Sequence, residues 1–320
     1  MLQNIAITNY KSVRELKLEA KRINVFIGEP NTGKSNIIEA LALLSGNNIR
    51  PEIFKEMFRF GTLADLFFDQ QVSNAIEVKA DDKRRLFEFN KGMFSFSAFT
   101  ENILQGSAQL DQRGQFSNWP DASGGVRLYR FKENIQLNFP EYGSLTPPFG
   151  QNLVSILYTN KSLRRRVSDL FRTRDFRLEI KPVEMQLSLA KAIDDEFYSF
   201  PYDSISETWR RMVFYMALLE TNQHATLLLD EPETNTFPFY TAYLAERIAL
   251  DESNQFILTT HNPYILGSIV GKVPVKDLAV FVTTMEDFAT KIKQVSVAGL
   301  SKILDYGPDA FLNLDKLVEA

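Results

Sequence analysis

The sequence predicts an α/β fold with a mostly parallel central sheet, an antiparallel β subdomain and an inserted helical lobe. Three runs with apolar centres have the length of buried strands: RINVFI at 22–27, ATLLLD at 225–230 and NQFILTTH at 254–261. Helical patterns lie between or directly after them, which is the order that a parallel sheet requires. In addition, a glycine-rich turn, GEPNTGKS at 28–35, joins the first of these strands to a helix.

Composition narrows the class of protein. The chain has 320 residues, no cysteine and a formal net charge of −4. Disulfides, thiolate metal sites and cysteine nucleophiles are therefore excluded, and a globally basic nucleic-acid binder is disfavoured. The N-terminus lacks the apolar core of a signal peptide, and no apolar run approaches the ~20 residues that cross a bilayer. We expect a cytoplasmic protein with no membrane association.

The first half of the chain predicts three kinds of element in order. NIAITNY at 4–10 and RELKLEA at 14–20 alternate as paired strands do, and SNIIEALALLS at 35–45 has helical spacing. From about 75 to 140, short β-like runs alternate with Gly, Asn and Asp, which predicts antiparallel hairpins. These runs are AIEVKA (75–80), RLFEFN (85–90), MFSFSAF (93–99), VRLYRF (126–131) and IQLNF (135–139).

The second half begins with Arg-rich helical segments at 151–177 and returns to α/β alternation. RLEIKPVEMQLSLA at 177–190 predicts β structure, and SETWRRMVFYMALLE at 206–220 predicts a helix. A further helix is expected at 240–250 and a further strand at 277–285, with PYILGSIV (263–270) between that last strand and the one at 254–261. We expect one continuous domain over 1–320, with a core lobe at about 1–150 and 222–320 and a helical lobe at about 151–221.

GEPNTGKS matches the pattern GxxxxGK[ST], in which backbone amides wrap around phosphates. Glycine at 28 and 33 permits unusual dihedrals and close backbone approach. Lys34 is expected to reach the β- and γ-phosphates and Ser35 to offer a hydroxyl to Mg²⁺. The sequence therefore predicts a P-loop nucleoside triphosphatase that uses ATP and Mg²⁺. Its nucleotide-binding residues are Gly28, Glu29, Pro30, Asn31, Thr32, Gly33, Lys34, Ser35 and Asn36.

Two further strand ends complete the predicted site. The strand at 225–230 delivers Asp230 to the carboxyl edge of the sheet as a Mg²⁺ ligand, and Glu231 beside it is suited to activate water. His261 follows the next strand, on the same edge, where an imidazole contacts the γ-phosphate. Glu231, His261 and Lys34 are the predicted catalytic residues. A lone histidine is also compatible with a purely structural role.

GEPNTGKSN, LLLDEPE and TTHNP, together with the opening NIAITNYKSVRELKL, resemble the ABC-type ATPase heads of the SMC/RecF/OLD class. The resemblance covers nearly the full length and is closest to compact OLD-like "AAA family" ATPases, many of which serve in DNA repair or antiphage defence. It implies an ATP-dependent, head-to-tail homodimer in which a signature helix of each head faces the ATP of the other. The chain lacks room for a long coiled coil and for a TOPRIM domain, which implies an ATPase subunit or a stand-alone switch.

The resemblance places the signature at 204–211, with Ser206, Glu207 and Thr208 as its site residues. Thr208 stands where the family usually has glycine, so slow hydrolysis is implied. An ordinary capped helix is the alternative. The family also uses a glutamine beside Mg²⁺, and either Gln70 or Gln71 fits.

A basic cluster lies in the expected helical lobe, and it includes Arg164, Arg165, Arg166, Arg172 and Arg174. It suits a phosphate backbone, an acidic partner or a solvated helix face. Three functions remain open at this point. The favoured one is an ATPase whose dimerisation gates an effector protein. The alternatives are a directly DNA-binding, RecF-like ATPase and a nucleotide-dependent scaffold with little hydrolysis.

Overall fold

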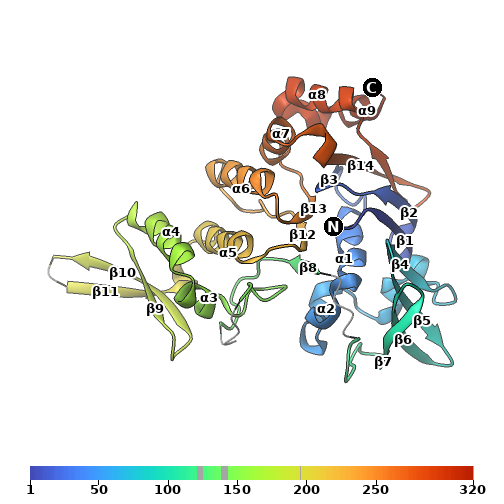
Figure 1. Cartoon of the computed structure of the whole chain (residues 1–320), viewed down its shortest axis with the longest axis horizontal. Helices are drawn as coiled ribbons and strands as arrows, with labels where there is room; N and C mark the ends of the chain where they lie inside the picture. The colour runs from blue at the N-terminus through green and yellow to red at the C-terminus, as the bar shows by residue number, and fades with distance from the viewer. Residues whose placement is uncertain (121–124, 138–142, 195, 320) are drawn as a thin grey trace.

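The computed structural model describes residues 1–120, 125–137, 143–194 and 196–319. Its centre is a mixed six-stranded sheet, mostly parallel (Figure 1). The strand order is β15 (Ala289–Gln294), β14 (Leu278–Glu286), β3 (Ile23–Gly28), β13 (Gln255–Thr259), β12 (Thr226–Asp230) and β8 (Val126–Tyr129). Only β15 runs antiparallel to its neighbour, so the carboxyl ends of the other five strands share one edge. The predicted fold class is confirmed.

Both faces of β3, β12 and β13 are buried, which explains why these central strands are mostly apolar. In β3, Ile23, Val25 and Ile27 pack into one core with residues of α5 (Glu207–Thr221), α6 (Pro238–Leu250) and α7 (Pro263–Lys272). Phe26 points to the opposite core, formed with α1 (Lys34–Ala42) and a second sheet. The sheet is thus a middle layer between helices and an antiparallel β layer.

The second sheet is wholly antiparallel and forms the outer layer beyond α1. Its strands, in order across the sheet, are β2 (Val13–Glu19), β1 (Asn4–Tyr10), β4 (Ile76–Ala80), β5 (Lys83–Asn90), β6 (Met93–Thr100) and β7 (Ile103–Leu110). The predicted opening strand pair and the three predicted hairpin strands at 75–99 are confirmed. The short helix α2 (Pro51–Phe58) lies between β3 and β4 in the chain.

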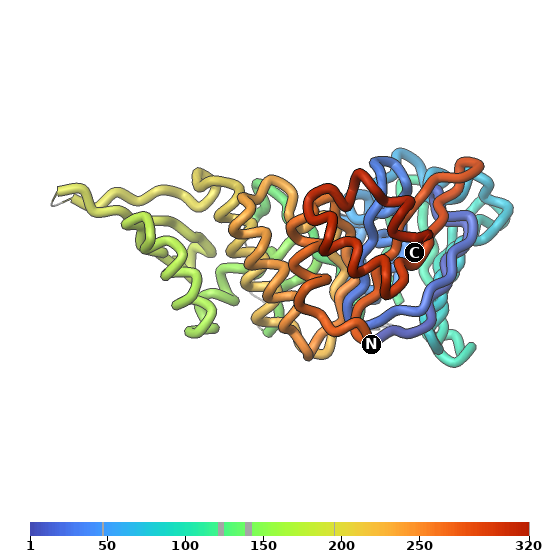
Figure 2. Tube along the Cα trace, turned by 90° about the horizontal axis from the view of Figure 1, so that it is seen from above, coloured from blue at the N-terminus to red at the C-terminus, as the bar shows by residue number. Residues whose placement is uncertain are grey.

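The described part of residues 153–201 extends away from the two sheets (Figure 2). It contains α3 (Leu153–Thr159), α4 (Lys161–Arg172) and a three-stranded antiparallel sheet in the order β11 (Glu196–Pro201), β10 (Gln186–Ile193), β9 (Arg177–Lys181), whereas α5, which follows, packs against the central sheet. The hairpin of β10 and β11 projects furthest from the rest of the chain in both ribbon views. The helices α8 (Val297–Tyr306) and α9 (Leu314–Val318) lie beside α7, at the top of Figure 1.

The structure differs from the sequence prediction at VRLYRF (126–131) and at the described part of IQLNF (135–139). VRLYRF does not join a hairpin: its strand, β8, pairs in parallel with β12 at the edge of the central sheet. The pattern of a four-residue strand does not distinguish an antiparallel hairpin from the edge of a parallel sheet. The difference lies in which strand it pairs with, and here that partner is far away in the sequence. In the predicted run IQLNF, residues 135–137 form no strand, and 138–139 lie outside the described residues.

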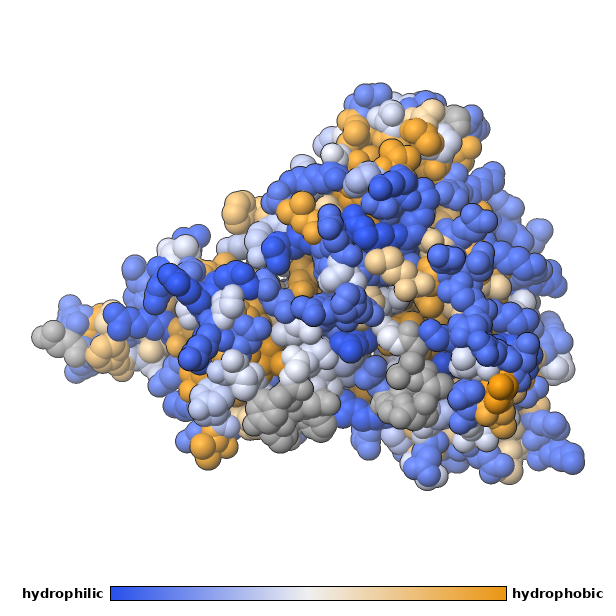
Figure 3. Space-filling model, in the orientation of Figure 1, coloured by the Kyte–Doolittle hydropathy of each residue, from blue (hydrophilic) through white to orange (hydrophobic). Residues whose placement is uncertain are grey.

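The face shown in Figure 3 is mostly hydrophilic, with hydrophobic side chains gathered at the end that carries α8 and α9. Val297, Leu304 and Leu312 are exposed in that region. Among the described residues, every helix is too short or too polar to span a bilayer.

Candidate nucleotide-binding site

The loop between β3 and α1 has a backbone that only glycine tolerates at two points. Gly28 has φ 153° and Gly33 has φ 89°, both in the region that side chains disfavour. A Cβ on Gly33 would lie 1.9 Å from Thr290 Oγ1, and one on Gly28 would lie 2.3 Å from Thr283 Oγ1. The glycines therefore let the loop curl tightly against β14 and β15, with the N-terminus of α1 directly behind it.

Lys34, the first residue of α1, folds back over this loop. Its Nζ donates to the carbonyl oxygens of Gly28 (3.0 Å) and Glu29 (2.7 Å). Burial lowers the pKa of Lys34, and the carboxylates of Glu231 and Asp230 oppose that shift. The ammonium group thus lies in a half-desolvated position, where a phosphate would be a much stronger partner than two carbonyls.

Asp230 ends β12 beside this loop, and its Oδ1 atom accepts two hydroxyl hydrogen bonds. Ser35 Oγ and Thr259 Oγ1 each donate to it at 2.8 Å. A hydroxyl paired with one carboxylate is the donor set that Mg²⁺ takes from P-loop proteins, because the ion keeps several waters and binds phosphate oxygens as well. Ser35 and Asp230 therefore fit a magnesium ion bridged to a nucleotide.

Glu231 and His261 meet on the same edge of the sheet. His261 Nε2 lies 2.8 Å from Glu231 Oε1, and both side chains are 37% exposed. The Glu231 backbone is held in the left-handed region, at φ 45°, while its amide donates to Thr259 Oγ1 at 3.0 Å. The Glu231 carboxylate thus pairs with His261 and keeps access to solvent, as a water-activating group requires.

Glu233 is a further carboxylate of this loop, and the sequence analysis missed it. Its Oε1 accepts from the Thr260 hydroxyl and, at 3.2 Å, from the His261 amide, so it supports the turn that carries the imidazole. Burial raises the pKa of Glu233 to about 7, and its Oε2 atom is buried without a hydrogen-bond partner in the described structure. The repeated acidic residues of DEPE were the available signal.

Arg130 and Glu39 were also missed. Because Leu229 pairs with Tyr129 in parallel register, the next residues, Asp230 and Arg130, lie side by side. Arg130 Nη2 is 3.2 Å from Asp230 Oδ2 and 3.5 Å from Glu39 Oε1. The incorrect hairpin prediction for β8 hid Arg130. The signal for Glu39 was a single charged residue inside the apolar helix NIIEALALL.

The predicted signature residues lie at the start of α5. Ser206 is the N-cap residue, but its hydroxyl makes no capping bond. Thr208 Oγ1 donates to the Asn235 carbonyl at 3.0 Å, and Glu207 contacts Arg211 at 2.6 Å and the Asn235 amide at 3.3 Å. The segment is therefore attached to the loop that follows Glu231.

The two glutamines that were expected beside Mg²⁺ lie elsewhere. Gln70 and Gln71 are exposed on a short 3₁₀ turn, and Gln70 Nε2 donates to Asp65 Oδ1 at 3.0 Å. Across the described ranges, neither of them bonds with Ser35 or Asp230. The structure thus does not bring these two residues to the site.

The predicted basic cluster lies on and just after α4, whose apolar face is buried. Two of its arginines form ion pairs, Arg166 with Glu220 and Arg172 with Asp169 (3.2 Å), and Arg164 donates to the Tyr158 carbonyl. Arg165, Arg166, Arg172 and Arg174 are exposed. Part of the positive charge of this cluster is therefore already paired with carboxylates of the same chain.

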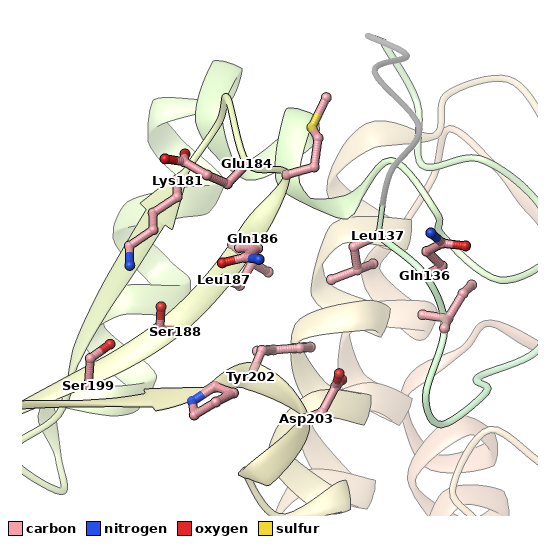
Figure 4. Close-up of a pocket in the computed structure, with 13 residues that line it drawn as sticks. Gln136, Leu137, Lys181, Glu184, Gln186, Leu187, Ser188, Ser199, Tyr202 and Asp203 are labelled. Carbon is pink, nitrogen blue, oxygen red and sulfur yellow. The ribbon is translucent and has the colours of Figure 1, made fainter.

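A pocket of about 530 Å³ lies between the β9–β11 sheet and residues 135–137. Figure 4 shows Gln136 and Leu137 on the opposite side of it from Gln186 and Ser188. None of the phosphate-loop residues lines this pocket, nor do Asp230 and His261. It is separate from the candidate nucleotide site.

Comparison with known sequences finds an ATPase domain family and two relatives that match in part. Residues 1–112 match the AAA ATPase domain family. A 90-residue segment is 33% identical to an uncharacterized protein of Methanocaldococcus jannaschii and covers 25% of this chain and 41% of that protein. A 52-residue segment is 36% identical to an ATP/GTP phosphatase of Helicobacter pylori and covers 16% of this chain and 14% of that protein. The matches thus span less than half of either relative.

Comparison with solved structures concerns the fold. An SMC head bound to the C-winged helix domain of ScpA superposes with a TM-score of 0.53 at 13% sequence identity. The match covers 93% of this chain and 98% of that chain. Together with the domain match at 1–112, this fold supports ATP binding and hydrolysis. The chain has the architecture of an ABC-type ATPase head of the SMC class.

Proposed function

We propose that this protein is a magnesium-dependent ATPase that binds ATP at the carboxyl edge of its central sheet and hydrolyses it slowly. One observation carries the proposal. A single edge holds the phosphate loop, the Ser35–Asp230 hydroxyl–carboxylate pair at 2.8 Å and the Glu231–His261 pair at 2.8 Å. These are the parts that phosphoryl transfer to water needs: an anion cradle, a metal ligand set and a group that orients the nucleophile.

In this proposal each group has one task. The backbone N–H groups of the phosphate loop, from which Pro30 is excluded, and the ammonium of Lys34 hold the phosphates, aided by the positive end of α1. Ser35 and Asp230 would hold Mg²⁺, which would supply positive charge to offset that of the phosphates. Glu231 orients a water in line with the γ-phosphate and receives its proton. His261, held by Glu231 and through its own amide by Glu233, contacts the γ-phosphate.

The proposal extends to a head-to-tail homodimer closed by ATP, in which α5 of one copy faces the nucleotide of the other. Ser206 suits this role because it is exposed at the helix N-terminus and its hydroxyl makes no capping bond. Closure and opening would gate an effector protein in the cytoplasm, in a DNA-repair or antiphage process. A partner protein that binds the closed head is consistent with the fold, since the matching SMC head was solved with the C-winged helix domain of ScpA bound.

The experiment is phosphate release by the purified chain and by Glu231→Gln. We expect the variant to lose at least about 100-fold in rate, because the carboxylate that accepts the proton is gone, while nucleotide affinity is retained. Glu252→Gln, an exposed carboxylate on another loop, is the matched control and should hydrolyse ATP normally. Equal rates for the chain and Glu231→Gln would contradict the assignment of Glu231.

A further inference from the structure

We propose that Arg130 is a positioning residue of the metal site: it holds Asp230 in the nucleotide-free chain and gives this carboxylate up to Mg²⁺ when the nucleotide binds. The inference rests on the proposed function, because it needs Mg·nucleotide to bind at this edge. It goes further because it assigns the Arg130 guanidinium as a cation that competes with Mg²⁺ for Asp230. This competition sets the Mg²⁺ concentration at which the nucleotide binds.

The two oxygens of Asp230 have different partners. Oδ1 accepts from Ser35 and Thr259, both at 2.8 Å, whereas Oδ2 is 3.2 Å from Arg130 Nη2. Only 9% of the Asp230 side chain and 21% of the Arg130 side chain are exposed. The pair is thus shielded from most solvent screening, and the guanidinium occupies the half of the carboxylate that the hydroxyl groups leave open.

Arg130 also has acceptors that do not depend on Asp230. Its Nη2 lies 3.5 Å from Glu39 Oε1, and its Nη1 donates to the Glu56 carbonyl at 3.2 Å. Glu39 is fully buried and also pairs with Lys11 at 2.6 Å and with Arg59. When Arg130 releases Asp230, its charge therefore keeps a buried carboxylate and a carbonyl, and the exchange strands no unpaired ion.

The exchange follows from electrostatics. Mg²⁺ carries twice the charge of a guanidinium, so it would prevail at Asp230 once its concentration suffices. Two cations that share one carboxylate repel each other, so binding one would lower the affinity for the other. Removing Arg130 should therefore let Mg²⁺ act at lower concentration.

The test is the affinity for a fluorescent ADP analogue measured across a range of free Mg²⁺ concentrations. We expect the Mg²⁺ midpoint to fall at least threefold in Arg130→Gln and by less in Arg130→Lys, which keeps the charge. Lys132→Gln is the matched control: it removes a nearby cation that pairs with Glu56 at 2.7 Å and should leave the midpoint unchanged. Circular dichroism melting of each variant verifies that it is folded.

Two outcomes would overturn the inference while leaving the proposed function intact. One is an unchanged Mg²⁺ midpoint in folded Arg130→Gln. The other is weaker nucleotide binding at saturating Mg²⁺ with no change in midpoint, which would make Arg130 a phosphate ligand. Failure of the unaltered chain to bind the analogue at any Mg²⁺ concentration would instead refute the proposed function, and the inference with it.

Discussion

At the scale of single residues, the candidate site is a set of side chains whose hydrogen bonds fix one another. Thr259 donates to Asp230 and accepts from the Glu231 amide, so one hydroxyl couples the metal ligand to the water-activating residue. Glu233 likewise holds His261 in place, because its Oε1 atom accepts a hydrogen bond from the His261 amide. A carboxylate this deeply buried ionises at a cost, and that cost makes a measurable difference to stability.

We predict that the free energy of unfolding falls between about pH 4.5 and pH 7 through Glu233. Burial raises its pKa to about 7 in the folded chain from an ordinary value of 4.5, so the folded state binds more protons in this window. The contribution is greatest at the acid end and is lost as the pH rises to about 7, by up to about 3 kcal/mol.

Urea unfolding at pH 5 and pH 7.5 measures this effect by comparison with Glu233→Gln. The variant is neutral at every pH and should lack that part of the slope, so the difference between the two proteins isolates Glu233. An identical pH slope for both proteins would show that Glu233 ionises normally in the folded chain.

Residue-level prediction relied on the coincidence of a residue type with a strand end or a helix start. Asp230 ends one apolar strand, His261 follows the next, and Lys34 begins the helix after a third, and the parallel strands bring these positions to one edge. Arg130 also follows a strand, but β8 is four residues long and its partner, β12, lies about 100 residues away. No local sequence pattern indicates such a distant pairing, so Arg130 was not predicted as a residue of the site.

At the scale of elements, Glu220 joins three helices of the α5 side of the sheet. This α5 residue pairs with Arg166 of α4 and, at 3.0 Å, with Arg247 of α6, and only 16% of its side chain is exposed. Arg166 is thereby occupied within the lobe, which weakens its case as a nucleic-acid contact. The remaining exposed arginines of the cluster keep the DNA-binding alternative open to a salt-dependent binding assay.

We predict that Glu220→Gln lowers the free energy of unfolding by about 0.5–1 kcal/mol, the range of partly exposed ion pairs. The loss should shrink in high salt, because screening already weakens both pairs in the unaltered chain. Urea unfolding at low and high ionic strength measures it, with Glu252→Gln as control. A loss that is the same at both salt concentrations would assign the effect to packing.

Prediction of elements failed where the same short strand pattern occurs both in an antiparallel hairpin and at the edge of a parallel sheet. The hairpin strands at 75–99 and β8 are short, apolar and β-branched or aromatic in the same way, yet they belong to different sheets. The hairpins are linked by tight turns, a local feature, whereas β8 depends on tertiary pairing. β11 and β15 were not predicted, although each forms an antiparallel hairpin with the strand before it.

At the scale of the whole molecule, a layered core carries the candidate site, and α3, α4 and the β9–β11 sheet project from that core (Figures 1 and 2). We predict that Glu231→Gln forms a stable dimer in Mg·ATP, because the nucleotide that closes the dimer persists when hydrolysis is blocked. Light scattering measures the mass. A monomer mass at saturating Mg·ATP would contradict closure by ATP.

The most direct test of the account is titration calorimetry with a slowly hydrolysed Mg·ATP analogue on the unaltered chain, Lys34→Ala and the control Lys276→Ala, which removes an exposed lysine. The account predicts binding by the unaltered chain and the control, and at least about a 100-fold loss in Lys34→Ala, roughly 2.7 kcal/mol. Equal affinity in a folded Lys34→Ala would place the nucleotide elsewhere and contradict the assignment of the phosphate loop.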